Sequence, residues 1–93
     1  MRRYGFTLRC YHCGDAVECE GMWHEMTCEG DVQPGNSWYC GEYRDQNNVL
    51  QTVNCSEWNA AGCVTGPEGG FPDGWDVCFC DWDFCNAGDE KSR

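Results

Sequence analysis

Apolar and polar residues alternate along short stretches of the chain, and turn-forming residues separate these stretches. No window repeats apolar residues at the i, i+3, i+4, i+7 spacing of an amphipathic helix. The stretch 7–12, Thr-Leu-Arg-Cys-Tyr-His, alternates and is rich in residues that favour strands. The pattern therefore predicts a β protein built from short strands.

The clearest predicted unit is a β-hairpin over residues 37–55. Two strand-like runs, 37–44 and 49–55, flank the polar turn Asp45-Gln46-Asn47-Asn48. Two such runs around a short polar turn are the usual signature of an antiparallel hairpin. We expect this hairpin to be the central element of the fold.

The last third of the chain begins with a predicted loop and ends with a predicted strand. Residues 66–74 contain four glycines and two prolines, which disfavour both helix and strand. Residues 75–80 alternate again and place Trp75, Val77 and Phe79 on one face. We expect Trp38, Trp75 and Val77 to contribute to the core.

Composition indicates that disulfides, rather than an aliphatic core, hold these predicted strands together. Only 12 of the 93 residues are Leu, Ile, Val or Phe, and the formal charge is −10, which together are typical of disorder. Ten residues are cysteine, however, a fraction found in disulfide scaffolds. Disulfides can replace a missing aliphatic core, since each contributes about 2–4 kcal/mol by constraining the unfolded chain.

The same numbers exclude several function classes. A charge of −10 disfavours binding to nucleic acid and to anionic lipid headgroups. No apolar run approaches the length of roughly 20 residues that spans a bilayer. Only five residues separate Met1-Arg2-Arg3 from the segment that begins at Arg9-Cys10, so no export signal is visible. We expect a mature extracellular domain from which the signal has been removed.

The cysteines cannot be paired from their spacing, because ten cysteines allow several hundred connectivities. The two ends of the cysteine pattern nevertheless resemble a known family. The opening Leu8-x-Cys10-Tyr11-x-Cys13 and the closing Cys80-Asp81-Trp82-Asp83-Phe84-Cys85-Asn86 are similar to the two signatures of the three-finger LU domain. This family is named for the lymphocyte antigen six proteins and the urokinase receptor. Because Phe79 separates Cys78 from Cys80, the ending looks more like the invertebrate quiver/sleepless type.

This resemblance implies a small all-β, disulfide-rich, three-finger fold with five disulfides. It divides the chain into an N-terminal extension (1–7), the LU domain (8–86) and a flexible polar tail (87–93). The fingers would run over 10–28, 40–55 and 63–78. The implied pairs are Cys10–Cys40, Cys13–Cys19, Cys28–Cys55, Cys63–Cys78 and Cys80–Cys85.

Metal and catalytic readings of the sequence are weaker than this structural one. Cys10 and Cys13 with His12 and His24 suggest zinc, but four ligands would leave six cysteines without partners. Paired cysteines provide no nucleophilic thiolate, and no Ser–His–Asp arrangement stands out. The acidic residues lack the ligand order of a calcium loop. We therefore expect no enzyme activity, no cofactor and no metal. Asp83 and Asn86 are expected to have structural roles.

Candidate partner-binding residues come from an excess of aromatic residues and methionine on the predicted fingers. Aromatic, Met and Arg side chains are enriched at the centres of protein interfaces. The alternative reading is that they simply cover the thin sheet. The candidates are Met22, Trp23, Met26, Tyr43 and Arg44.

Two asparagines are candidate modification sites. Asn54-Cys55-Ser56 is an N-glycosylation sequon. Asn86 and the two small residues that follow it resemble a lipid-anchor attachment site, which family members often carry.

These observations predict a non-enzymatic extracellular recognition domain, secreted or on the outer face of the plasma membrane. By resemblance, its protein partner would be an ion channel, a receptor or a cell-contact complex. We expect a monomer that binds no nucleic acid and meets the membrane only through a lipid anchor. Two alternatives remain open: the ectodomain of an activin or bone-morphogenetic-protein type receptor, and a secreted toxin-like or pheromone-like protein.

Overall fold

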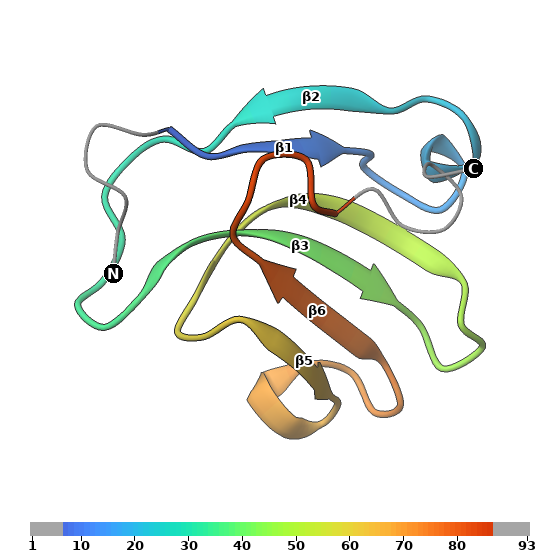
Figure 1. Ribbon diagram of the computed structural model, residues 1–93. Helices are drawn as coiled ribbons and strands as arrows, with labels where there is room; N and C mark the ends of the chain where they lie inside the picture. The colour runs from blue at the N-terminus through green and yellow to red at the C-terminus, as the bar shows by residue number, and fades with distance from the viewer. Residues whose placement is uncertain (1–6, 87–93) are drawn as a thin grey trace.

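The computed structural model describes residues 7–86 as six antiparallel strands and two short 3-10 turns (Figure 1). No α-helix occurs among these residues, and no helix in this range has the length and apolar character needed to cross a bilayer. The predicted small all-β class is therefore confirmed. The elements are β1 (Arg9–His12), η1 (Glu18–Glu20), β2 (His24–Thr27), β3 (Ser37–Arg44), β4 (Leu50–Trp58), β5 (Gly62–Thr65), η2 (Glu68–Gly70) and β6 (Asp76–Cys80).

The strands form three consecutive hairpins in two sheets. β1 and β2 make a two-stranded sheet, and the other four strands make a second sheet in the order β4-β3-β6-β5. In Figure 1 the loops that close the three hairpins all extend toward the same side of the molecule. We call this side the loop end.

The predicted hairpin over 37–55 is confirmed and extends further than the alternation indicates. Strand β4 continues to Trp58, and β3 pairs with it from Ser37↔Trp58 to Arg44↔Leu50. The predicted strands at 7–12 and 75–80 appear as β1 and β6. The loop predicted over 66–74 is mostly irregular, but it contains the 3-10 turn η2, with Gly69 at φ 73°.

Five disulfides cross-link the fold. They join Cys10–Cys40, Cys13–Cys19, Cys28–Cys55, Cys63–Cys78 and Cys80–Cys85, which are the pairs that the family resemblance implies. All ten cysteines lie within the described residues, and none is a free thiol. Two of the bridges, Cys10–Cys40 and Cys28–Cys55, tie the first hairpin to the second.

The core consists of cysteines and a few aliphatic side chains rather than of tryptophans. One buried cluster contains Leu8 with Cys10, Cys28 and Cys40. The second contains Leu50 and Val53 with Cys13 and Cys19, and we call it the loop-end cluster.

The predicted core residues are only partly correct. Val77 is fully buried, and the half-buried Trp38 packs against the first cluster, whereas the half-buried Trp75 belongs to neither cluster. The Trp38 indole donates a hydrogen bond to the Gly30 carbonyl (3.0 Å). A thin two-layer body cannot enclose a side chain as large as tryptophan on all sides. The interior is therefore filled by smaller side chains.

The carboxy-terminal segment is held to β1 by side chains that accept and donate backbone hydrogen bonds. The Arg9 N–H donates to Asp83 Oδ1 (3.0 Å). Asn86 is buried; its Oδ1 accepts from the Tyr11 N–H, and its Nδ2 donates to the carbonyls of Tyr11 and Gly41 (3.0, 3.1 and 3.1 Å). These contacts are structural, as the sequence predicts. The predicted polar tail, 87–93, lies outside the described residues, as does all but Thr7 of the predicted extension.

Candidate interaction surface

Of the five predicted partner-binding residues, only Met22 is exposed, with 59% of its surface accessible; the other four are half-buried. Its neighbour Trp23 is half-buried and packs against the loop-end cluster. The Trp23 indole donates to the Cys19 carbonyl (2.9 Å), and its ring lies edge-on to Tyr11 at 5.8 Å. Trp23 therefore holds the first hairpin loop in place.

Met26, Tyr43 and Arg44 also make their main contacts within the fold. The Met26 sulfur accepts the Cys55 N–H (3.4 Å). Arg44 forms an ion pair with Glu42 (3.4 Å). Tyr43 and Arg44 are consecutive in β3, so their side chains leave opposite faces of the sheet. The structure thus does not join the five predicted residues into one exposed patch, and their binding role stays a prediction.

The sequence could not separate these two roles. Aromatic residues and methionine are enriched at interfaces, but they also fill the irregular interior of a small domain. Only three-dimensional packing shows which use a side chain has.

Exposed apolar side chains gather instead around the loops of the first two hairpins. Val17 and Met22 flank η1, and Val49 precedes β4; their exposed fractions are 74%, 59% and 46%. Element η1 contacts β4, because Cys19 and Leu50 both belong to the loop-end cluster. The Cys13–Cys19 disulfide closes the first loop over this cluster. The three exposed side chains therefore stand on a rigid base.

The turn that carries Val49 is fixed by one carboxylate. Asp45 Oδ1 accepts the N–H groups of Asn47 (2.9 Å) and Val49 (3.0 Å), and Oδ2 accepts from Gln51 (2.8 Å). These hydrogen bonds lower the pKa of Asp45 below its ordinary value of 3.8, and the one from the Val49 N–H has the largest effect. Asp45 is therefore ionised at neutral pH and holds the turn in one conformation.

A second apolar surface lies on the face of the four-stranded sheet that points away from β1 and β2. We call it the outer face. The Trp58 and Phe79 rings are stacked on it at 5.0 Å, and Phe71 from the β5–β6 loop lies 5.3 Å from Trp58. Tyr43 stands edge-on to Phe71 and Phe79 at 6.0 and 6.3 Å. Sequence reasoning missed Trp58 and Phe71; the run of alternation through β4 could have placed Trp58 on this face.

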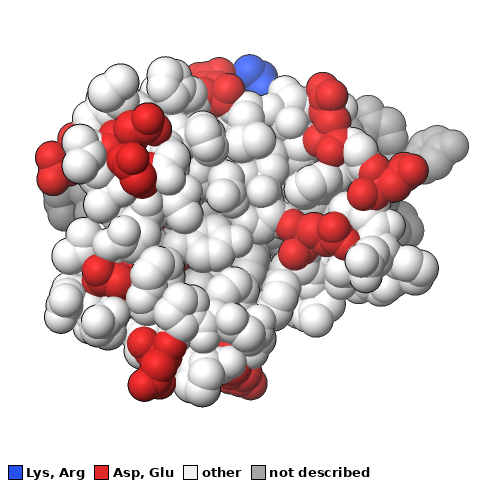
Figure 2. All heavy atoms as spheres, turned by 180° about the vertical axis from the view of Figure 1, so that it is seen from behind, with Lys and Arg blue, Asp and Glu red and all other residues white. Residues whose placement is uncertain are grey.

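Acidic side chains surround this face. Seen from behind, the centre of the molecule over the four-stranded sheet shows no Asp, Glu, Lys or Arg side chain, whereas Asp and Glu occur around its margin (Figure 2). In this view, acidic side chains therefore border a centre that has no charged group. Such a surface attracts basic partners from a distance.

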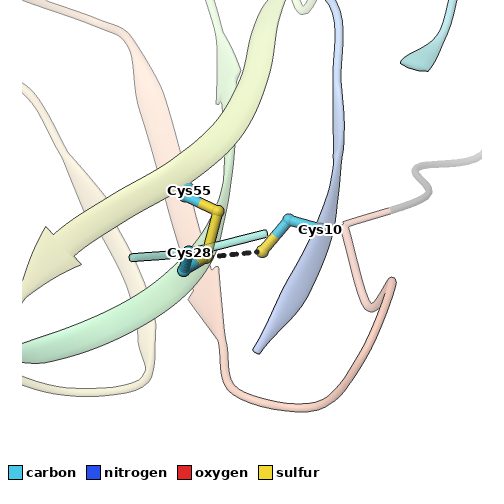
Figure 3. A group of neighbouring side chains, drawn as sticks. All are labelled: Cys10, Cys28 and Cys55. Atoms are coloured by element: carbon cyan, nitrogen blue, oxygen red, sulfur yellow. Dashed lines mark hydrogen bonds between the residues drawn. A yellow bond between two sulfur atoms is a disulfide. The ribbon is translucent and has the colours of Figure 1, made fainter. Parts of the chain in front are cut away.

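Three cysteine sulfurs approach one another between the sheets. The sulfurs of Cys10, Cys28 and Cys55 lie within 4.8 Å, and those of Cys10 and Cys28 are 3.5 Å apart (Figure 3). Zinc binds thiolates, whereas each of these sulfurs is bonded in a disulfide. The group is therefore a packing contact between two bridges.

The two candidate modification sites lie on different parts of the fold. Asn54 is half-buried in β4, on the outer face. The Asn86 side chain is occupied by β1 and β3, as described above. A lipid anchor is joined through the main-chain carbonyl, and the residues beyond Asn86 lie outside the described range, so this site stays a prediction.

Comparison with known proteins adds no relative. The chain matches no protein-family model, no curated protein and no solved structure.

Proposed function

We propose that this chain is an extracellular recognition domain of the three-finger LU type, which binds a protein partner and catalyses no reaction. Three features support the proposal: three hairpins with their loops on one side, five disulfides in the pairs that the family resemblance implies, and a closing segment held by Asp83 and Asn86. Many disulfides also fit an oxidising, extracellular environment.

The observation that carries the binding proposal is the set of exposed apolar side chains at the loop end. Val17, Met22 and Val49 remain accessible although the loops beneath them are fixed by a disulfide and a buried cluster. Because these loops are already ordered, docking sacrifices little conformational entropy. Exposed apolar groups on a rigid base are suited to the centre of an interface.

Charge specifies the partner further. Asp15, Glu18 and Glu20 belong to the first loop, and Asp45 belongs to the second. A complementary surface would therefore be apolar at its centre and basic at its rim. We propose that the partner is a membrane protein with such a surface, for example a channel, a receptor or a cell-contact protein. The domain itself would be secreted or lipid-anchored at the same cell surface.

A cell-surface staining experiment tests the proposal. The domain, linked to a multimeric fluorescent carrier, is applied to a panel of animal cell lines, with and without prior protease treatment of the cells. We expect protease-sensitive staining that weakens as salt is raised. The variant Met22→Ser/Val49→Ser should reduce it about tenfold or more, since interface anchors each contribute upwards of about 1 kcal/mol.

The matched control is Trp82→Ser. Trp82 is equally exposed, at 61%, but it belongs to the carboxy-terminal segment. Staining that survives in the loop variant, or that falls equally in the control, would contradict the proposed surface. Staining of no line, or staining that resists protease, would contradict a cell-surface protein partner.

A further inference from the structure

The outer face carries an unusual combination of aromatic rings and a glycosylation sequon. Its strand positions carry no charged side chain: Tyr39, Gly41 and Tyr43 of β3, Thr52, Asn54, Ser56 and Trp58 of β4, Gly62 and Val64 of β5, and Val77 and Phe79 of β6. Val77 and Phe79 are buried, whereas Tyr39, Tyr43 and Trp58 are partly exposed, and exposed apolar patches mark interaction sites. The sequon asparagine lies among these residues, in β4, at the edge of the sheet.

The side-chain contacts of Asn54 leave its modifiable atom available. Asn54 Oδ1 accepts the Ser56 hydroxyl (2.6 Å), so the Tyr43 hydroxyl donates in turn to Ser56 (2.7 Å). No partner of Asn54 Nδ2 occurs among residues 7–86. An N-linked sugar is attached at Nδ2 and leaves Oδ1 free to accept. The observed hydrogen bonds are therefore compatible with the modified side chain.

A glycine keeps this arrangement open. Asn54 lies opposite Gly41 in the β3–β4 ladder. A Cβ at Gly41 would come within 2.5 Å of Ser56 Oγ and 3.0 Å of the Tyr43 ring. Without that Cβ, the chain of hydroxyls from Tyr43 to Asn54 fits across the ladder. The chain links Asn54 directly to a ring of the aromatic group.

We infer that Asn54 carries an N-linked glycan whose first sugars lie over the aromatic rings of the outer face. In the transfer, Nδ2 forms a bond to C1 of a sugar on a lipid pyrophosphate donor. The sugar–phosphate bond breaks, Nδ2 loses a proton and the lipid pyrophosphate leaves. Sugar rings present C–H groups on one side, and these pack favourably on the electron-rich faces of aromatic rings. The inference rests on the extracellular location proposed above.

The order of events follows from the fold. Cys55, the middle residue of the sequon, is bonded to Cys28, and the sequon lies within β4. The glycan is therefore attached while the chain is still extended and the bridge is open. Delaying disulfide formation should raise the fraction of modified chains.

A glycan on this face would also limit which surface a partner can reach. It covers the outer face and leaves the loop end accessible. The partner would then approach Met22 and Val49 and would not contact Trp58.

The test uses the chain secreted from eukaryotic cells behind a cleavable export signal. Mass spectrometry after peptide N-glycosidase locates modified asparagines by their conversion to aspartate. Fluorescence of a dye that binds apolar surfaces is measured with the glycan present, after its removal, and in Asn54→Gln. The matched controls are Asn54→Gln/Val49→Thr, which moves the sequon to Asn47 in the exposed β3–β4 turn, and Asn54→Gln/Val49→Ala, which changes the same loop-end side chain without creating a sequon. Thermal melting checks that every variant is folded.

We expect Asn54 to be modified, and more fully when a mild reductant is present during synthesis. Glycan removal and Asn54→Gln should both raise dye fluorescence several-fold, and the relocated glycan should not lower it again. An unmodified Asn54, an unchanged signal after removal, or equal protection from Asn47 would overturn the inference. Loss of cell staining in Trp58→Ser would also overturn it, since a protein would then occupy the face. A negative dye result leaves the Met22/Val49 staining test unaffected, so the two proposals fail separately.

Discussion

Asn86 shows how one side chain can close a small fold. It is 2% exposed, and it satisfies the N–H and C=O of Tyr11 and the C=O of Gly41. The hydrogen bond to Gly41 is buried, and those to Tyr11 are partly buried. A buried polar group that loses its partner is costly, which makes this position more sensitive than its size suggests.

We therefore predict that Asn86→Ala lowers the free energy of unfolding by about 2–3 kcal/mol, measured by denaturant titration. Asp83→Ala is the control, because Asp83 is exposed and accepts one backbone N–H, from Arg9. Asp83→Ala should lower the free energy of unfolding by about 1 kcal/mol or less. Equal losses in the two variants would contradict the role assigned to Asn86.

Glu57 links β4 to the connecting segment between β2 and β3. Its Oε2 accepts the Asn36 side-chain amide (2.9 Å) and the Gln33 N–H (2.8 Å). These hydrogen bonds lower the pKa of Glu57 below its ordinary value of 4.5, and the one from Asn36 has the largest effect. Because the folded-state pKa is the lower one, the ionised side chain stabilises the fold above the ordinary value. That stabilisation is lost as the pH falls through the folded-state pKa.

Melting temperatures measured between about pH 6 and pH 2.5 test this linkage. The wild type should lose stability on acidification below about pH 4.5, and Glu57→Gln should lose less, because its amide does not titrate. Glu25→Gln is a suitable control, since Glu25 is an exposed acid paired with Arg9 on β1. A Glu57→Gln curve parallel to that of the wild type would show that Glu57 does not contribute to the pH dependence.

Among the elements, the long hairpin and strands β1 and β6 were predictable, whereas β2 and β5 were not. The residues of β3 and β4 alternate over many positions around a polar turn, and that local signal survives in the fold. Strands β2 and β5 have four residues each, HEMT and GCVT, which are too short for a clear pattern. Their extended conformation depends on pairing with β1 and β6, which is information held elsewhere in the chain.

The candidate surface was predictable only in part for the same reason. Met22 lies in a loop, where exposure follows from local sequence. The packing of Trp23 depends on Cys19 and Leu50, and that of Tyr43 depends on Ser56 and Phe71. Contacts between distant residues are not visible as periodicity in one sequence.

The five disulfides should contribute unequally to the stability of the fold. Cys13–Cys19 spans 6 residues and Cys28–Cys55 spans 27. Loop-closure entropy alone makes the longer bridge more stabilising by about 1 kcal/mol. It also joins two hairpins, whereas the shorter one closes a single loop. Cys28→Ala/Cys55→Ala should therefore melt well below Cys13→Ala/Cys19→Ala in thermal unfolding.

Both partners must be replaced together in this comparison. In Cys55→Ala alone, the Cys28 thiol would remain 3.5 Å from Cys10, within reach of the Cys10–Cys40 bridge. Thiol–disulfide exchange would then scramble the pairing. If the two double variants melt at the same temperature, the structural difference between the bridges has no energetic consequence.

At the scale of the whole molecule, covalent bonds replace most of the apolar core. Twelve Leu, Ile, Val and Phe residues in 93 are too few to offset the conformational entropy of an ordered chain. The five bridges make up this deficit and leave the remaining apolar side chains for two surfaces. One is the loop end around Met22 and Val49, and the other is the outer face around Trp58.

Both proposed surfaces depend on the same pairing of cysteines, so the most direct test is to map the disulfides of the secreted, unreduced protein. Proteolysis and mass spectrometry should yield the five pairs of the structure and no alkylated thiol. The nearest alternative pairs Cys10 with Cys28, whose sulfurs are 3.5 Å apart, and Cys40 with Cys55, which are opposite each other in the β3–β4 ladder. Recovery of Cys10–Cys40 and Cys28–Cys55 peptides is the predicted result. Recovery of Cys10–Cys28 and Cys40–Cys55 peptides would contradict it, because the first hairpin would then no longer be bonded to the second.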